Sequence, residues 1–222
     1  MRKIYLIIFL QVFVINAKSQ CNNDTIMIER FNYKAVEGLS PPSVLLQEGD
    51  WLIGITYYNY NKSGTQREYA PAREFYHVQK AFHPNGVISR YTKLMGSVAF
   101  GERKFYNEKG EITEIIDEDA KFGKIKPRDF VNILEKIGWI NRKTGENIVT
   151  KEPLKTDGTF TMRLRRLLEI RFFPAEYGED GKEIKPPVWR AGYVSGNIQH
   201  YCYVDGNTGE YKFDKFSFQI IL

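Results

Sequence analysis

The sequence has 222 residues and a formal net charge of +5, and 42% of its residues are hydrophobic, 27% charged and 14% aromatic. This length fits one domain or two small ones, and the hydrophobic share permits a real core, which argues against a disordered chain. Collagen is excluded because glycine does not recur at a fixed period, and a coiled coil is excluded because heptad repeats are absent. A disulfide scaffold is excluded because there are only two cysteines.

Residues 1–19 have the layout of a secretory signal peptide. Arg2 and Lys3 precede an apolar run at 4–15, and the small residues Ala17 and Ser19 follow it. The run is shorter than the roughly 20 residues of a membrane span, although an N-terminal anchor helix stays open as an alternative. Cleavage after Ser19 leaves 203 residues and lowers the net charge to +2. The Ser-Gln ending resembles exported proteins of Bacteroidetes type, so we expect a periplasmic or secreted protein.

Cys21 follows the apolar run and raises a second option, an outer-membrane lipoprotein. Lys18 and Gln20 depart from the apolar and small residues that lipidation sites carry, so this option is less favoured. Export exposes Cys21 and Cys202 to an oxidising compartment, where a disulfide persists. A Cys21–Cys202 bridge and two unpaired thiols both stay open.

Residues 20–120 are predicted to form an antiparallel β-meander. Turn signals of Gly, Asn and Asp separate runs of strand composition at 51–60, 74–82, 87–94, 102–106 and 111–116. Two segments, 82–88 and 106–112, look like copies: an aromatic residue, then Gly86 or Gly110, then Ile88 or Ile112. They resemble MORN-like hairpin repeats, which implies units stacked into an extended sheet. An ordinary meander with similar turns is the alternative.

A short linker at 121–126 and one clear helix at 127–137 are expected next. Pro127 suits a first helical turn, and Gly138 suits the position after a helix end. An apolar face recurs at helical spacing: Phe130, Val131, Leu134 and Ile137.

The remaining chain to residue 222 is expected to form a sheet that packs on this helix. Strand composition recurs at 189–194, 198–204 and 211–220. Residues 159–173 fit a strand or a helix, with the strand favoured, and 174–187 look like an inserted polar loop.

A family resemblance lies in residues 189–210. Trp189 opens a strand, and a second strand with Tyr203 ends in a turn containing Asp205, Thr208 and Gly209. Asp205 can accept backbone N–H bonds there, and Gly209 can adopt a positive φ. The pattern resembles the PepSY domain of peptidase propeptides and stand-alone exported proteins. The resemblance implies a helix packed on an antiparallel sheet and a non-catalytic binding or peptidase-inhibiting role.

No catalytic or metal-binding motif stands out. His77, His83 and His200 form no ligand pattern, so we expect no metal and no cofactor. The acidic run at 117–119 is expected to be a solvated loop.

Two groups are candidate binding residues. Trp51, Tyr57, Tyr58 and Tyr60 are aromatic residues of the kind that binding surfaces favour, although alternate aromatics of a sheet with one face in the core are the favoured explanation. Arg163 and Arg165 lead a basic cluster, for which a solvated face or an acidic envelope polymer is expected. Nucleic acid is not expected as a partner of an exported protein.

The sequence therefore predicts an α+β, mainly antiparallel β protein. Its parts are a signal peptide at 1–19, a meander at 20–120, a linker at 121–126 and a PepSY-like unit at 127–222, with no transmembrane segment in the mature chain. The expected function is non-catalytic binding of a protein, peptide or envelope polymer. The alternatives are a propeptide-type peptidase inhibitor or, less favoured, an envelope hydrolase using a carboxylate such as Glu114 or Asp117.

Overall fold

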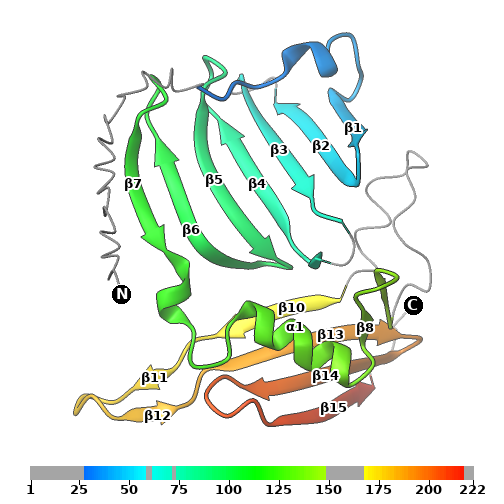
Figure 1. The fold of residues 1–222 in the computed structure, drawn as a ribbon, viewed down its shortest axis with the longest axis vertical. Coiled ribbons are helices and arrows are strands. Elements are labelled where there is room, and N and C mark those ends of the chain that lie inside the picture. Colours follow the sequence, from blue (N-terminus) through cyan, green and yellow to red (C-terminus); the bar gives the residue numbers. More distant parts are fainter. Residues whose placement is uncertain (1–27, 59–61, 72–73, 149–167, 218–222) are drawn as a thin grey trace, which may run out of the picture.

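The computed structural model describes residues 28–58, 62–71, 74–148 and 168–217 (Figure 1). Within them lie a seven-stranded and a four-stranded antiparallel sheet and one α-helix, which confirms the predicted fold class. Several predicted features lie outside these residues: the predicted signal peptide at 1–19, Cys21, Tyr60, Arg163, Arg165 and most of the 159–173 segment. No helix in the described part of the chain combines the length and the hydrophobicity needed to cross a bilayer.

The first sheet is a meander whose strands follow one another in chain order, as Figure 1 shows. Its strands are β1 Ser43–Glu48, β2 Trp51–Tyr58, β3 Ser63–Tyr69, β4 His77–Phe82, β5 Ile88–Met95, β6 Val98–Tyr106 and β7 Ile112–Asp117. All five predicted strands of this region are present. β1 and β3 were not predicted.

One face of this sheet is partly covered by the chain that enters it. Ile53, Ile55 and Phe82 are buried on that face beneath Phe31 and Val36, which flank the short helix η1 Tyr33–Ala35. The ring of Phe31 lies directly over Gly64 in β3, where a Cβ atom would overlap it. A glycine at this position is therefore required by the packing.

The two predicted repeat segments form the same turn. The N–H groups of His83 and Asn107 each donate to the carbonyl four residues on, at 2.8 and 3.0 Å, and Gly86 and Gly110 have φ of 80° and 84°. Asn85 joins the two turns by donating to Glu108 O at 2.9 Å. A third turn at 178–182 repeats these backbone bonds. Its sequence hides the likeness, because Glu183 stands two residues after Gly181, where the other two segments have Ile88 and Ile112.

The second unit places the helix on one face of the four-stranded sheet. Its elements are η3 Glu118–Lys121, α1 Pro127–Lys136, β8 Ile140–Asn141, β9 Glu146–Asn147, β10 Glu169–Phe173, β11 Glu176–Tyr177, β12 Glu183–Lys185, β13 Val188–Ser195, β14 Ile198–Asp205 and β15 Tyr211–Ser217. The sheet order is β10-β13-β14-β15. Trp189 is fully buried between the sheet and α1, and its ring stacks on Phe130 at 4.9 Å. Trp189 is thus the core anchor that was expected.

Two segments of this unit differ from their prediction. The expected linker is part of the core, because Phe122 stacks on Trp189 at 4.9 Å and Ile125 O accepts a bond from the indole of Trp189 at 2.9 Å. The expected polar loop at 174–187 contains the β11–β12 hairpin, whose exposed charged residues hid its strand character. The described end of 159–173 is strand β10, as favoured.

The two sheets are joined through the β5–β6 turn. Met95 and Val98 are buried in the same hydrophobic cluster as Trp189 and Leu134. Ser97 donates its hydroxyl to Ile170 O at 3.0 Å, on the outer edge of β10. The two units therefore share a core.

Candidate functional site

The first sheet carries a row of aromatic side chains on one face. The antiparallel register and the alternation of side chains place Trp51, Tyr76 and Phe100 on the same face. Their rings are in contact, at 6.2 Å between Trp51 and Tyr76 and 5.9 Å between Tyr76 and Phe100. Phe100 is paired with Lys93 across the β5–β6 ladder, so the row leads directly into a pocket.

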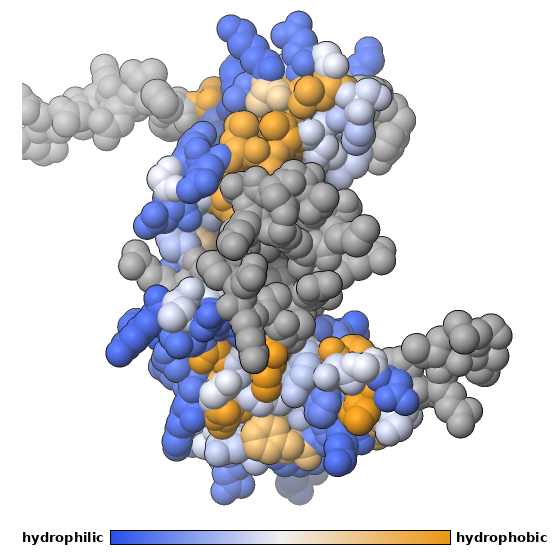
Figure 2. All heavy atoms as spheres, turned by 90° about the vertical axis from the view of Figure 1, so that its right-hand side faces the viewer, coloured by the Kyte–Doolittle hydropathy of each residue, from blue (hydrophilic) through white to orange (hydrophobic). Residues whose placement is uncertain are grey.

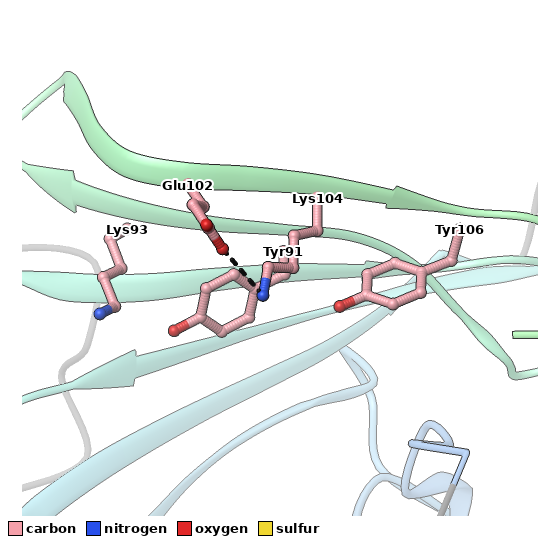
Figure 3. A pocket seen from close by; sticks show the side chains of 5 residues that line it. All are labelled: Tyr91, Lys93, Glu102, Lys104 and Tyr106. Carbon is pink, nitrogen blue, oxygen red and sulfur yellow. Dashed lines mark ion pairs between the residues drawn. The ribbon is translucent and has the colours of Figure 1, made fainter. Parts of the chain in front are cut away.

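The pocket lies on this same face and encloses about 310 Å³ (Figure 3). The described residues that line it belong to β5 and β6: Tyr91, Lys93, Glu102, Lys104 and Tyr106. Figure 3 shows the five side chains projecting to one side of the strands. We call these five residues together with Trp51, Tyr76 and Phe100 the aromatic track.

Of the three charged side chains in the pocket, two pair with each other and one does not. Lys104 Nζ lies 3.0 Å from Glu102 Oε2, and this hydrogen bond raises the pKa of Lys104. Burial raises the pKa of the Tyr91 hydroxyl, which keeps that group neutral. The side chain of Lys93 makes no hydrogen bond, ion pair or ring contact with any residue in the described ranges. The pocket thus presents one unpaired ammonium group beside two tyrosine rings.

A neighbouring lysine on the same face is already satisfied. Lys80 Nζ contacts Glu29 at 2.7 Å and Glu68 at 2.5 Å. Burial lowers the pKa of Lys80, but its hydrogen bonds to the two carboxylates outweigh burial, and the net pKa is raised. Lys80 therefore stays charged and is paired with two carboxylates, unlike Lys93.

The aromatic residues singled out in the sequence do not form one surface. Trp51 belongs to the aromatic track. Tyr57 lies on the same face but packs under Phe31 and Tyr33, at 6.0 and 5.6 Å between ring centroids. Tyr58 is the next residue along β2 and points to the opposite face. Only Trp51, among the candidates that the structure describes, lies at the site.

The four-stranded sheet also has an open face, on the side away from α1. Arg190 lies between the rings of Phe173 and Tyr201, at 5.3 and 4.7 Å from their centroids. Tyr201 lies over Gly192, and Tyr203 lies next to it at 5.8 Å. Phe173 is exposed, as is Phe216 on β15. We call Phe173, Arg190, Tyr201, Tyr203 and Phe216 the arginine face.

The turn at 205–209 has the local geometry that its residues predict. Asp205 Oδ1 accepts the N–H groups of Asn207 and Thr208, both at 2.8 Å, and these bonds lower the pKa of Asp205. Gly209 has a φ of 77°. The turn holds the β14–β15 hairpin and presents no convergent catalytic groups.

The acidic run at 117–119 is a structural element and only in part solvated. Glu118 is buried and contacts Arg103 at 2.5 Å and Lys121 at 2.6 Å, and Asp119 accepts a bond from Gly101 N at 2.9 Å. Asp117 caps η3 by accepting from Asp119 N. These carboxylates hold the end of the first sheet.

Cys202 is fully buried on the α1 side of its sheet and forms no disulfide with any described residue, and burial raises the pKa of its thiol to about 11. Its pairing with Cys21 stays a prediction, since Cys21 lies outside the described residues. Among the residues that the structure describes, no three His, Cys, Asp or Glu side chains gather as a metal site would require.

Most residues of the aromatic track were missed in the sequence. Tyr91 and Lys93 come from β5, Phe100, Lys104 and Tyr106 come from β6, and Tyr76 directly precedes β4. Only the pairing between strands shows that they share a face. The alternation of Tyr91 with Lys93 and of Lys104 with Tyr106 was the available signal.

No protein-family model matches the chain, and no curated protein matches its sequence.

Proposed function

We propose that the chain is an exported, non-catalytic binding protein that holds a polymer of the cell envelope on the aromatic track. The observation that carries this proposal is the contiguous row of rings leading into a pocket on a sheet face. Aromatic rings give a large contact area at low entropic cost, and a rigid sheet holds them in place. The signal-peptide pattern supports an envelope location for the ligand.

A binding assay with mutants of the two sheet faces tests this proposal. The intact protein is titrated by calorimetry with peptidoglycan fragments and with soluble acidic and neutral envelope polysaccharides. Trp51→Ala and Tyr76→Ala are expected to weaken binding by about tenfold or more, since each removes a stacking surface. Tyr58→Ala, on the opposite face of β2, is the matched control and is expected to bind like the parent protein.

The same samples separate binding from hydrolysis. A binding protein leaves the chain length of the polymer unchanged during long incubation, whereas a hydrolase creates new chain ends. New ends that disappear in Glu114→Ala or Asp117→Ala would overturn the proposal in favour of the hydrolase. Equal binding by the parent and Trp51→Ala would also contradict it.

The arginine face favours a second candidate, peptidase inhibition by a PepSY-like unit. Arg and Tyr are the residues most often found at the centres of protein interfaces, and Arg190 is held between two rings. A panel of secreted metallopeptidases assayed with micromolar protein tests this candidate. Inhibition that is lost in Arg190→Ala would support it, and an absence of inhibition across the panel would reject it. We also propose that the first sheet is related to MORN-like hairpin repeats.

A further inference from the structure

The charges in the pocket indicate which kind of polymer the protein binds. Glu102 neutralises Lys104, whereas Lys93 has no partner among the described residues. The residues that line the pocket therefore carry one net positive charge, next to the rings of Tyr91 and Tyr106. The surrounding face is not positive as a whole, because Lys80 is shared by Glu29 and Glu68, and Asp117 is paired with Glu102 across the β6–β7 ladder. The anion-binding group of the pocket is therefore the ammonium group of Lys93 itself.

Most of the backbone around the pocket is paired within the sheet, apart from the bulge that leaves Thr92 and residues 101–103 outside the β5–β6 register. β5 is hydrogen-bonded to β4 and β6, and β6 is hydrogen-bonded to β5 and β7. An extended peptide usually adds as a strand to a free sheet edge, where main-chain bonds provide its affinity. The centre of a sheet face instead presents ring surfaces, ammonium groups and hydroxyls. These groups match the ring faces and carboxylates of a sugar acid better than they match a peptide.

We infer that the pocket binds a carboxylate-bearing sugar residue of an acidic polysaccharide. One sugar ring lies against Tyr91 and its carboxylate pairs with Lys93, while neighbouring sugars extend along Phe100, Tyr76 and Trp51. This inference rests on the proposed function and names the chemistry of the polymer. Glu102 limits the affinity for the anion, because it occupies Lys104.

The experiment compares two ligands that differ only in charge. The full chain is titrated with oligogalacturonate and with the same oligosaccharide after methyl esterification, which removes the carboxylate charge. We expect the acid to bind about fivefold or more tightly at low ionic strength. The difference should shrink as salt is raised from about 20 to about 500 mM, because salt screens exposed charges.

Two variants of the pocket are expected to shift the preference in opposite directions. Lys93→Met keeps the length of the side chain and should abolish the preference for the acid. Glu102→Gln frees Lys104 and should tighten binding of the acid by about threefold or more, with little effect on the ester. Lys109→Met, in the exposed β6–β7 turn, is the control for a general loss of positive charge.

The outcomes separate this inference from the proposed function. Equal binding of acid and ester that Trp51→Ala abolishes would overturn the acidic ligand and leave the polymer proposal intact. Failure of the protein to bind any polysaccharide would overturn both. Binding of poly-L-glutamate as tightly as the oligogalacturonate would overturn the sugar in favour of an acidic peptide. Unchanged circular dichroism spectra of the variants confirm that each comparison concerns folded protein.

Discussion

At the scale of single residues, two turns of the second unit are held by the same bonds. Asn141 Oδ1 accepts the N–H groups of Lys143 and Thr144, at 3.0 and 3.3 Å. Asp205 does the same for the residues two and three positions on, and in both turns a threonine hydroxyl accepts a bond from the following glutamate N–H. The side-chain oxygen at the first position is therefore the common requirement, whether or not it is charged.

Replacement of Asp205 tests this requirement. Asp205→Ala leaves two backbone N–H groups of the turn without their acceptor and should lower the free energy of unfolding by about 1 kcal/mol. Asp205→Asn keeps the acceptor, as Asn141 does naturally, and should lose less than half as much. Urea unfolding followed by circular dichroism measures both variants. An equal loss in the two would mean that the charge, and not the acceptor, stabilises the turn.

His77 gives the protein a pH-dependent stability. Burial, followed by the nearby charge of Arg67, lowers the pKa of His77 to about 4, and its ring packs against Tyr69 at 5.3 Å. In the unfolded chain the imidazole titrates near 6.5, so the unfolded state binds more protons between these values. The contribution is complete above about pH 6.5 and is lost as the pH falls toward 4.

The expected loss from His77 is about 1–2 kcal/mol over this range, since the ring keeps some solvent contact. Unfolding free energies measured near pH 7 and near pH 4.5 give the slope. His77→Phe keeps an aromatic ring and cannot be protonated, so its slope should be smaller than that of the parent by this amount. An identical slope in parent and variant would show that other groups cause the acid sensitivity.

At the scale of elements, the segment around Phe31 depends on one glycine of β3. Gly64→Ala would place a methyl group within the ring of Phe31 and should cost about 2 kcal/mol through overpacking. Phe31→Leu in the same chain opens room for the methyl group. The double variant should therefore lose clearly less stability than the sum of the two single variants, as thermal or urea unfolding can measure. Strict additivity would contradict the contact.

Strands with clear turn signals on both sides were predictable, and so was the helix. The limits of α1 were predicted from Pro127, the apolar face and Gly138. These signals are local, because each acts within one or two helical turns. β3 was missed because its residues are polar or small, and it becomes a strand only between β2 and β4. The secondary structure of such a segment is determined by pairing with neighbouring strands and not by its local strand propensity.

The candidate site was less predictable than the fold for a related reason. The sequence identified Trp51 but grouped it with Tyr57 and Tyr58. In the structure Tyr57 packs under Phe31, and Tyr58 points to the opposite face of the sheet. Bulges between β5 and β6 shift the pairing so that Tyr91 faces Lys104. The residue spacing within one strand cannot predict this contact, because the contact depends on how β5 and β6 pair with each other.

At the scale of the whole molecule, the shared core should make unfolding cooperative. Met95 belongs to the first sheet but is 2% exposed within the core of the second unit. Met95→Ala should cost about 2–4 kcal/mol and reduce hydrogen-exchange protection in β13 and β14 as well as in β5. Ile115→Ala, at an exposed position of β7, is the control and should change stability by less than about 0.5 kcal/mol. Loss of protection confined to β5 and β6 would show that the units unfold independently.

The two candidate surfaces lie on different sheets, and the core between them fixes their relative position. Ser97 and Ile170 make the direct link. A side view of the molecule shows apolar atoms gathered at its upper part, where the β1 edge lies, and again on the second unit (Figure 2). A polymer on the track and a protein on the arginine face could therefore be held at the same time.

The chain order of β1 to β7 also determines how the molecule can reach its folded state. Each strand pairs only with its neighbours in sequence, so hairpins can form one after another without closing a long loop. β10 is different, because it pairs with β13 across the β11–β12 hairpin and its outer edge rests on Ser97. We expect the first sheet to assemble rapidly from its local hairpins and then to serve as the surface on which the slower second sheet completes its pairing.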